Sequence, residues 1–217
     1  MRLLLAASPL LAASPLNAQD LTLPEADLLP RIIDFLCVDM VDETNGCEQI
    51  YLVASTEEVD TADLVILTDR RTDPGGAPLL IVRQVAFNGA MWGMAPSLEE
   101  TEDGALRLHS EQTGIGRHPW MQSLEIGYRN DAFLVTGFHY TTYDRISAAG
   151  FTCDFDMDGG YVRTEMRTID PETERETEIV QGYNVTPTTP PLDLWDAFQS
   201  MPDPCSDGLS EFFDMEF

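Results

Sequence analysis

The sequence predicts an α+β fold, which is mainly an antiparallel β-sheet of six to eight strands with short flanking helices near the N- and C-termini. Two segments carry the prediction of the sheet. Residues 120–140 alternate apolar and polar side chains on both sides of a polar turn at 129–131, which is typical of a β-hairpin. Residues 161–185 repeat this pattern around a turn at 170–173, so a second hairpin is expected there.

The segment before these hairpins divides into a helical and a β part. Residues 20–41 have apolar side chains at near-helical spacing, and two prolines in this stretch restrict where a helix can begin, so we expect broken helix. Short runs rich in branched apolar residues at 50–54, 64–68 and 79–87 predict strands, and the last two form a hairpin around the turn signal at 72–76.

The remaining segments are less regular. Residues 88–104 are acidic and without a period, and residues 186–191 read as a linker of Pro and Thr. A short helix is expected over 192–201, with Leu194, Trp195 and Phe198 on one side. The final residues, 212–217, are expected to be a docked C-terminal helix or a frayed tail.

The first 18 residues predict a signal peptide. Arg2 supplies a positive start, residues 3–16 are uncharged and largely apolar, and Ala18 is the preferred last residue before cleavage, with Ala13 as the second choice. Residues 19–217 are then expected to be a single secreted β-rich domain, periplasmic or secreted, in a bacterial host. Because no Cys lies near the cut, we expect a protein free of a lipid anchor, and no later stretch is long and apolar enough for a membrane span.

The charge balance excludes several classes of function. The chain has 38 acidic and 12 basic residues, which give a formal net charge of −26. All twelve basic residues are Arg. Without Lys there is no Schiff-base lysine and no Walker-type phosphate loop. The negative charge argues against nucleic acid and anionic membrane surfaces as partners, and it is consistent with a surface that keeps an exported protein soluble.

The four cysteines fit an oxidising compartment. None forms a Cys-x-x-Cys pair, and four cysteines allow three connectivities that the sequence alone does not separate. We favour one local bridge, Cys37–Cys47, and one long-range bridge, Cys153–Cys205. Loop-closure entropy assigns these at most about 3 and 4 kcal/mol of stability, respectively.

One motif suggests a metal ligand set. Residues 154–165 match the calcium-loop pattern D-x-D-x-D-G-x5-E, in which alternate carboxylates and a bidentate glutamate surround one cation. The candidate ligands are Asp154, Asp156, Asp158 and Glu165, and calcium is the only cofactor that the sequence suggests.

The context of this motif also supports a second interpretation. Neither flank reads as a helix, so an EF-hand is not expected. In a strand the three aspartates would share a solvated face, while Phe155 and Met157 would point into the core, and residues 158–160 would form a hairpin turn. The acidic composition makes such a motif frequent by chance, and we favour this solvated strand over the calcium loop.

No catalytic constellation stands out. The three histidines, His109, His118 and His139, lack metal-ligand spacing, and no Gly-x-Ser-x-Gly elbow is present. A pocket built from Arg117, His118 and Trp120 is conceivable, although a loop histidine packed against Trp120 is the simpler interpretation. We therefore assign no catalytic residue.

Part of the chain resembles a group of exported bacterial proteins of unknown function. The similarity rests on the runs at 117–120, 124–129, 132–137 and 153–160, and it covers about residues 117–168. In that group a strand, a tight turn, a strand ending in Gly and a third hairpin follow in order, forming a C-terminal β-meander. The resemblance implies this fold element and no catalytic residue.

Three functional hypotheses follow from these observations. The first, which we favour, is a non-enzymatic periplasmic binding or interaction protein with a protein or small-molecule partner still to be identified. The second is an exported domain stabilised by calcium at Asp154 to Glu165. The third is an exported hydrolase with a carboxylate-based site, which would need two facing carboxyl groups in a deep pocket and a raised pKa.

Overall fold

The computed structural model describes residues 27–41, 46–71, 73–170, 173 and 175–215. The chain divides into two units, 1–30 and 31–217, and of the first unit only residues 27–30 are described. The predicted signal peptide, 1–18, therefore lies outside the described residues. A single 3-10 turn, η1 (Leu29–Arg31), precedes the first strand.

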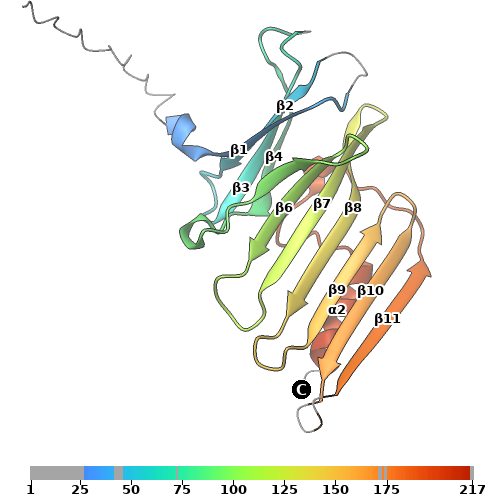
Figure 1. Ribbon diagram of the computed structural model, residues 1–217. Coiled ribbons are helices and arrows are strands. Elements are labelled where there is room, and N and C mark those ends of the chain that lie inside the picture. The colour runs from blue at the N-terminus through green and yellow to red at the C-terminus, as the bar shows by residue number, and fades with distance from the viewer. Residues whose placement is uncertain (1–26, 42–45, 72, 171–172, 174, 216–217) are drawn as a thin grey trace, which may run out of the picture. The chain divides into compact units, whose positions relative to one another are not determined.

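The second unit begins with a four-stranded antiparallel sheet in chain order (Figure 1). Its strands are β1 (Ile32–Val38), β2 (Glu48–Ala54), β3 (Thr61–Leu67) and β4 (Pro78–Phe87). The predicted hairpin of residues 64–68 and 79–87 is confirmed as β3 and β4.

The broken helix predicted over residues 20–41 is present in residues 27–31, which are helical, but the prediction is wrong for residues 32–38. Residues 32–38 form β1, which pairs with β2 from Ile32 opposite Val53 to Val38 opposite Glu48. The Cys37–Cys47 disulfide, with 5.4 Å between the two Cα atoms, links the end of β1 to the residue before β2. Buried Glu48 further fixes the connection by accepting the backbone N–H of Met40 at 2.8 Å.

A seven-stranded antiparallel sheet follows, also with neighbours in chain order. Its strands are β5 (Ser97–Glu100), β6 (Leu106–Gln112), β7 (Trp120–Arg129), β8 (Ala132–Tyr143), β9 (Gly150–Asp156), β10 (Tyr161–Ile169) and β11 (Glu176–Asn184). The two sheets together have eleven strands within the described ranges, more than the six to eight predicted in one sheet. Strand β5 and the 3-10 turn η2 (Ala90–Trp92) lie in the segment that was expected to be irregular.

Both hairpins predicted from alternation are confirmed. Strands β7 and β8 turn at Asn130 and Asp131, whose φ angles of 52° and 62° are left-handed. Such angles suit Asn and Asp because their short side chains tolerate this region better than most. Strands β10 and β11 pair without a break from Tyr161 opposite Asn184 to Ile169 opposite Glu176.

The helices are fewer than predicted, so the described chain is mostly β. The helix expected over 192–201 is only a 3-10 turn, η3 (Leu192–Leu194). Leu194 and Phe198 are exposed, while Trp195 is buried. Phe198 is part of the following loop. The docked C-terminal helix is confirmed as α2 (Asp203–Met215).

Helix α2 covers one face of the seven-stranded sheet, against β9 and β10 (Figure 1). The predicted Cys153–Cys205 disulfide joins β9 to the first turn of α2, with 5.6 Å between Cα atoms. Gly208 allows the close approach, because a Cβ there would lie 3.0 Å from the ring of Phe151. We call the covered side, with Phe151, Cys153 and Phe155, the helix face, and the other side, with Thr152, Asp154 and Asp156, the open face.

One apolar core contains residues of both sheets and of α2. The sheets also share polar links, as the N–H of Leu98 on β5 donates to the carboxylate of Asp34 on β1 at 2.7 Å. On β4, Gln84 adopts a φ of 53°, and its N–H donates to the buried carboxylate of Asp63 at 3.0 Å. Its carbonyl accepts the N–H of Ala197 at 3.0 Å, which fixes the segment that leads to α2.

Candidate functional site

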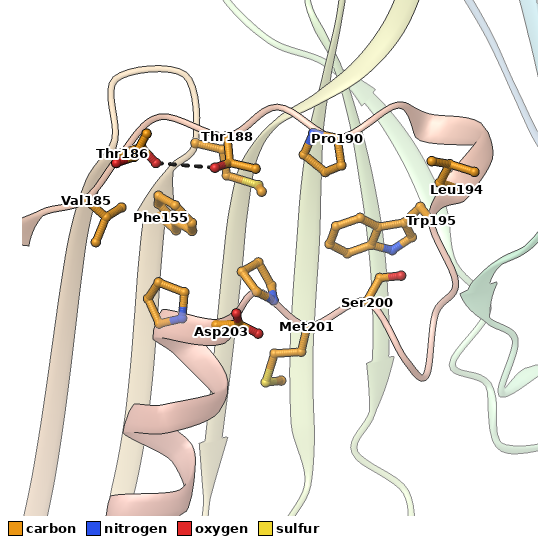
Figure 2. Close-up of a pocket in the computed structure, with 13 residues that line it drawn as sticks. Phe155, Val185, Thr186, Thr188, Pro190, Leu194, Trp195, Ser200, Met201 and Asp203 are labelled. Atoms are coloured by element: carbon orange, nitrogen blue, oxygen red, sulfur yellow. Dashed lines mark hydrogen bonds between the residues drawn. The ribbon is translucent and has the colours of Figure 1, made fainter.

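A cleft of about 480 Å³ lies between the helix face of the sheet and the segments before α2. Figure 2 shows Phe155 and Trp195 on opposite sides of it. The lining is mostly apolar: Phe155, Met157, Val185, Pro190, Leu194, Trp195, Met201, Pro202 and Pro204. Clefts of this size with an apolar lining and a few polar groups are typical of small-molecule sites.

The segment predicted as a Pro and Thr linker is one wall of this cleft. It continues from β11 and is fixed to the sheet by backbone bonds: Val185 N–H to Gly160 O at 2.8 Å, Thr188 N–H to Met157 O at 3.0 Å, and Val135 N–H to Pro190 O at 3.0 Å. Because proline has no N–H, the segment cannot continue as a regular strand, and Val185, Thr186, Thr188 and Pro190 line the cleft.

Trp195 is the most distinctive residue of the cleft. Its ring is 5% exposed and packs against Phe138, with 5.9 Å between ring centroids. Its Nε1–H finds no hydrogen-bond partner among the described residues. An unsatisfied buried donor costs about 1–3 kcal/mol, so a ligand or water oxygen at this position would be stabilised.

The polar groups of the cleft are Thr186, Thr188, Ser200 and Asp203. Among the described residues of the lining Asp203 is the only charged one, and it lies at the first turn of α2, where the helix dipole favours a carboxylate. With no Arg or His among these described lining residues and a net charge of −26 on the chain, the electrostatic potential disfavours an anionic ligand.

A second, polar site lies on the open face of the same sheet. Strand register places Ser123 of β7 opposite His139 of β8, and His139 opposite Asp154 of β9. The three residues line a hollow of about 220 Å³ together with Glu125 and Gly137.

The ion pairs of the open face hold Asp154 ionised. The hydrogen bond from His139 and, more weakly, the charge of Arg163 lower the pKa of Asp154 from its ordinary value of 3.8. Arg163 also contacts Glu165, with 2.7 Å between Nη2 and Oε2. Asp154 and Glu165 of the predicted calcium set thus have cationic neighbours of their own.

The other two predicted calcium ligands lie around the turn between β9 and β10. Asp156 accepts the N–H of Gly159 at 2.7 Å, and Asp158 forms an ion pair with Arg129. Phe155 and Met157 are buried, as the strand interpretation predicts. Within the described ranges, no three His, Cys, Asp or Glu side chains are grouped so that they could hold a metal ion.

The loop containing His118 is held by a buried carboxylate. Arg117 and His118 both face Asp144, whose side chain is fully buried, with 3.4 Å from His118 Nε2. The His118 ring packs against Phe213 of α2, with 5.0 Å between centroids. Trp120 instead packs against Phe87 and Tyr140, so the pocket of Arg117, His118 and Trp120 conceived from sequence is not observed as one site.

The third hypothesis, a carboxylate-dependent hydrolase, needs a carboxyl group with a raised pKa. Asp73, Glu99, Asp103, Asp154 and Asp158 all have pKa values lowered by hydrogen bonds. A carboxyl group that serves as a general acid near neutral pH needs the opposite shift. These five residues therefore do not supply the protonated carboxyl group of a glycosidase-type pair.

Sequence reasoning missed both candidate sites for the same reason. The cleft joins residues from β9, a linker and the start of α2. Ser123, His139 and Asp154, which we call the polar row, join three strands at separations of about 15 residues. Strand register would have revealed the row, because Ser123 and His139 flank the predicted turn at 129–131 symmetrically except for one register shift between Glu125 and Ile126.

Comparisons of this chain with protein-family models, with curated proteins and with solved structures find no match. The resemblance to exported bacterial proteins therefore stays a prediction. The two disulfides are compatible with a periplasmic or extracellular protein. No described helix has both the length and the apolar character that crossing a membrane requires.

Proposed function

We propose that this chain is an exported binding protein whose apolar cleft takes a small ligand with an apolar body, a hydrogen-bond acceptor and a neutral or cationic polar end. The observation that carries the proposal is the buried, unpaired Nε1–H of Trp195 in the wall of a mostly apolar cleft. The predicted leader and the two disulfides support export to an oxidising compartment.

Each part of the ligand matches one part of the cleft. The aromatic, aliphatic and thioether side chains favour an apolar body, at roughly 25 cal/mol for each Å² of apolar surface removed from water. Met157 and Met201 are flexible, which suits a wall that adapts to its ligand. The Trp195 donor selects a ligand oxygen or nitrogen that accepts a hydrogen bond, and Asp203 disfavours a carboxylate or phosphate group.

The experiment that tests the proposal is binding of a neutral fluorescent probe, N-phenyl-1-naphthylamine, to the oxidised mature protein. We expect saturable binding at one site, and we expect Met201→Glu to weaken it at least tenfold, because a charge in the apolar wall costs about 1.4 kcal/mol or more on desolvation.

Met121→Glu is the matched control. Met121 is 43% exposed on the open face, away from the cleft lining, so the same substitution there should leave probe binding unchanged. Equal probe affinity in the wild-type protein and in Met201→Glu would overturn the proposal, as would the absence of saturable binding.

A further inference from the structure

The polar row on the open face has the side chains that a nucleophilic site requires. None of the three residues of the row lines the cleft. Ser123, His139 and Asp154 lie on three neighbouring strands and are direct register partners. The imidazole Nδ1 of His139 lies 2.6 Å from Asp154 Oδ1. Gly137 has no side chain to fill the space beside them, and this leaves the hollow of about 220 Å³ that all three residues line.

The pairing with Asp154 determines what His139 can do. An ionised carboxylate accepts a hydrogen bond, so the neutral imidazole carries its proton on Nδ1 and its lone pair on Nε2. His139 Nε2 makes no hydrogen bond with a described residue, and its side chain is 42% exposed. Its lone pair is therefore free to accept a proton, which is the arrangement that a general base requires.

Ser123 lies on the opposite side of His139 from Asp154. Cross-strand partners on an antiparallel sheet have Cβ atoms about 4.5–5.5 Å apart, so the Ser123 side chain lies beside that of His139. The residue is 8% exposed, and its hydroxyl makes no hydrogen bond within the described part of the chain. The hydroxyl thus lines the hollow without a competing partner.

We propose that Ser123 is a nucleophile that His139 activates and Asp154 orients, and that it accepts the acyl group of a reactive ester. The Ser123 hydroxyl gives its proton to His139 Nε2 while Oγ bonds to the carbonyl carbon, and the ester alcohol leaves with that proton. Water then attacks the acyl-serine, its proton passes through His139 to Ser123 Oγ, and the carboxylic acid is released.

The surroundings of the row restrict the substrate. Glu125 and Asp156 line the same hollow, and Arg107 contacts Glu125, with 2.5 Å between Nη2 and Oε1. Two carboxylates beside the nucleophile disfavour an anionic acyl group. The class of substrate is therefore an ester with a neutral or cationic acyl group.

Covalent labelling with an uncharged fluorophosphonate tests the proposal, followed by peptide mass spectrometry of the folded, oxidised protein. We expect one adduct, on Ser123, and slow hydrolysis of p-nitrophenyl acetate. Ser123→Ala should abolish both. His139→Ala and Asp154→Asn should slow labelling tenfold or more and remove its dependence on pH, while their thermal midpoints show that they remain folded.

The matched control is Ser97→Ala. Ser97 is the register partner of His109, which pairs with Glu99 at 3.0 Å, so it is a second serine beside a histidine–carboxylate pair but outside the hollow. We expect unchanged labelling in Ser97→Ala. The proposal is overturned if Ser123 is not labelled or if His139→Ala is labelled at the wild-type rate.

Discussion

The imidazole of His139 and the carboxylate of Asp154 form a hydrogen bond across neighbouring strands, with 2.6 Å between Nδ1 and Oδ1. Arg163 approaches the second oxygen of the same carboxylate at 3.6 Å. Asp154, which the sequence suggests as a calcium ligand, is therefore the acidic member of the polar row. It also makes the stability of the sheet depend on pH.

The first prediction concerns that dependence. Because its partners lower the pKa of Asp154 below 3.8, the folded protein holds the ionised form better than the unfolded chain does. The stabilisation is present above about pH 4 and is lost as the pH falls through the folded-state pKa. Both groups are partly exposed, so we expect only about 0.5–1 kcal/mol.

Urea unfolding of Asp154→Asn at neutral pH and near pH 3 measures this effect. The variant should be less stable than the wild type at neutral pH, and the difference should shrink in acid. Asp193→Asn is the control, since Asp193 is exposed and makes no ion pair with a described residue. A difference in stability that does not change with pH would contradict the prediction.

The second prediction concerns calcium. To bind at the predicted loop, the ion would have to displace Arg129 from Asp158, and both His139 and Arg163 from Asp154. A ligand that binds only the folded state must raise the thermal midpoint. We expect equal midpoints in calcium, magnesium and chelator; a calcium-specific rise that Asp156→Ala removes would establish the site instead.

The third prediction concerns alkaline pH. Burial raises the pKa of Tyr140 to about 12, because the phenolate would be formed away from water. Between pH 10 and 12 the unfolded chain loses this proton and the folded protein keeps it. Stability should then fall by about 1.4 kcal/mol for each pH unit.

The absence of Lys makes this alkaline range unusually simple to interpret, since the other groups that ionise there are mainly the remaining tyrosines. Tyr140→Phe should show a shallower loss of stability above pH 10, measured by urea unfolding with brief exposure to base. Tyr161→Phe, at an exposed position, should retain the wild-type slope. Identical slopes in all three proteins would refute the assignment.

The fourth prediction concerns the wall of the cleft. Gly160 has a φ of 69°, and a Cβ there would lie 2.5 Å from the carbonyl oxygen of Val185. Gly160→Ala should therefore both destabilise the protein, by about 1–3 kcal/mol, and weaken probe binding, because the wall must move away.

Gly104 supplies the matched control for the fourth prediction. Its φ of 80° is also left-handed, but nothing lies within 4 Å of a Cβ at this position. Gly104→Ala should show the cost of the backbone angle alone, with probe binding intact. If the two variants lose the same stability and both bind the probe normally, then Gly160 does not position the wall.

Local patterns predicted the hairpins, because alternation and turn residues lie in short stretches of sequence. The favoured disulfide pairs agree with the structure, although the sequence alone left three connectivities open. Residues 32–38 show the limit of local patterns: an apolar cluster of that length suits a helix or a strand, and the observed pairing with β2 makes it a strand. Trp195 shows the same limit, since its burial depends on Phe138 and not on a helical face.

The candidate sites were less predictable still, because they depend on tertiary placement. One wall of the cleft is a proline-bearing segment bonded to the sheet, which from the sequence is predicted only as a linker. The row of Ser123, His139 and Asp154 requires the register of three strands, and one register shift between Glu125 and Ile126 changes that register.

The most direct test of the binding function is a competition experiment that varies only the head group of the ligand. Decylamine, decanol and decanoate are each added, at concentrations below micelle formation, as competitors of N-phenyl-1-naphthylamine bound to the wild-type protein and to Trp195→Phe. We predict that decanol and decylamine displace the probe and decanoate does not, and that Trp195→Phe weakens decanol binding. Preference for decanoate, or equal displacement by all three, would contradict a cleft whose selectivity comes from Asp203 and Trp195.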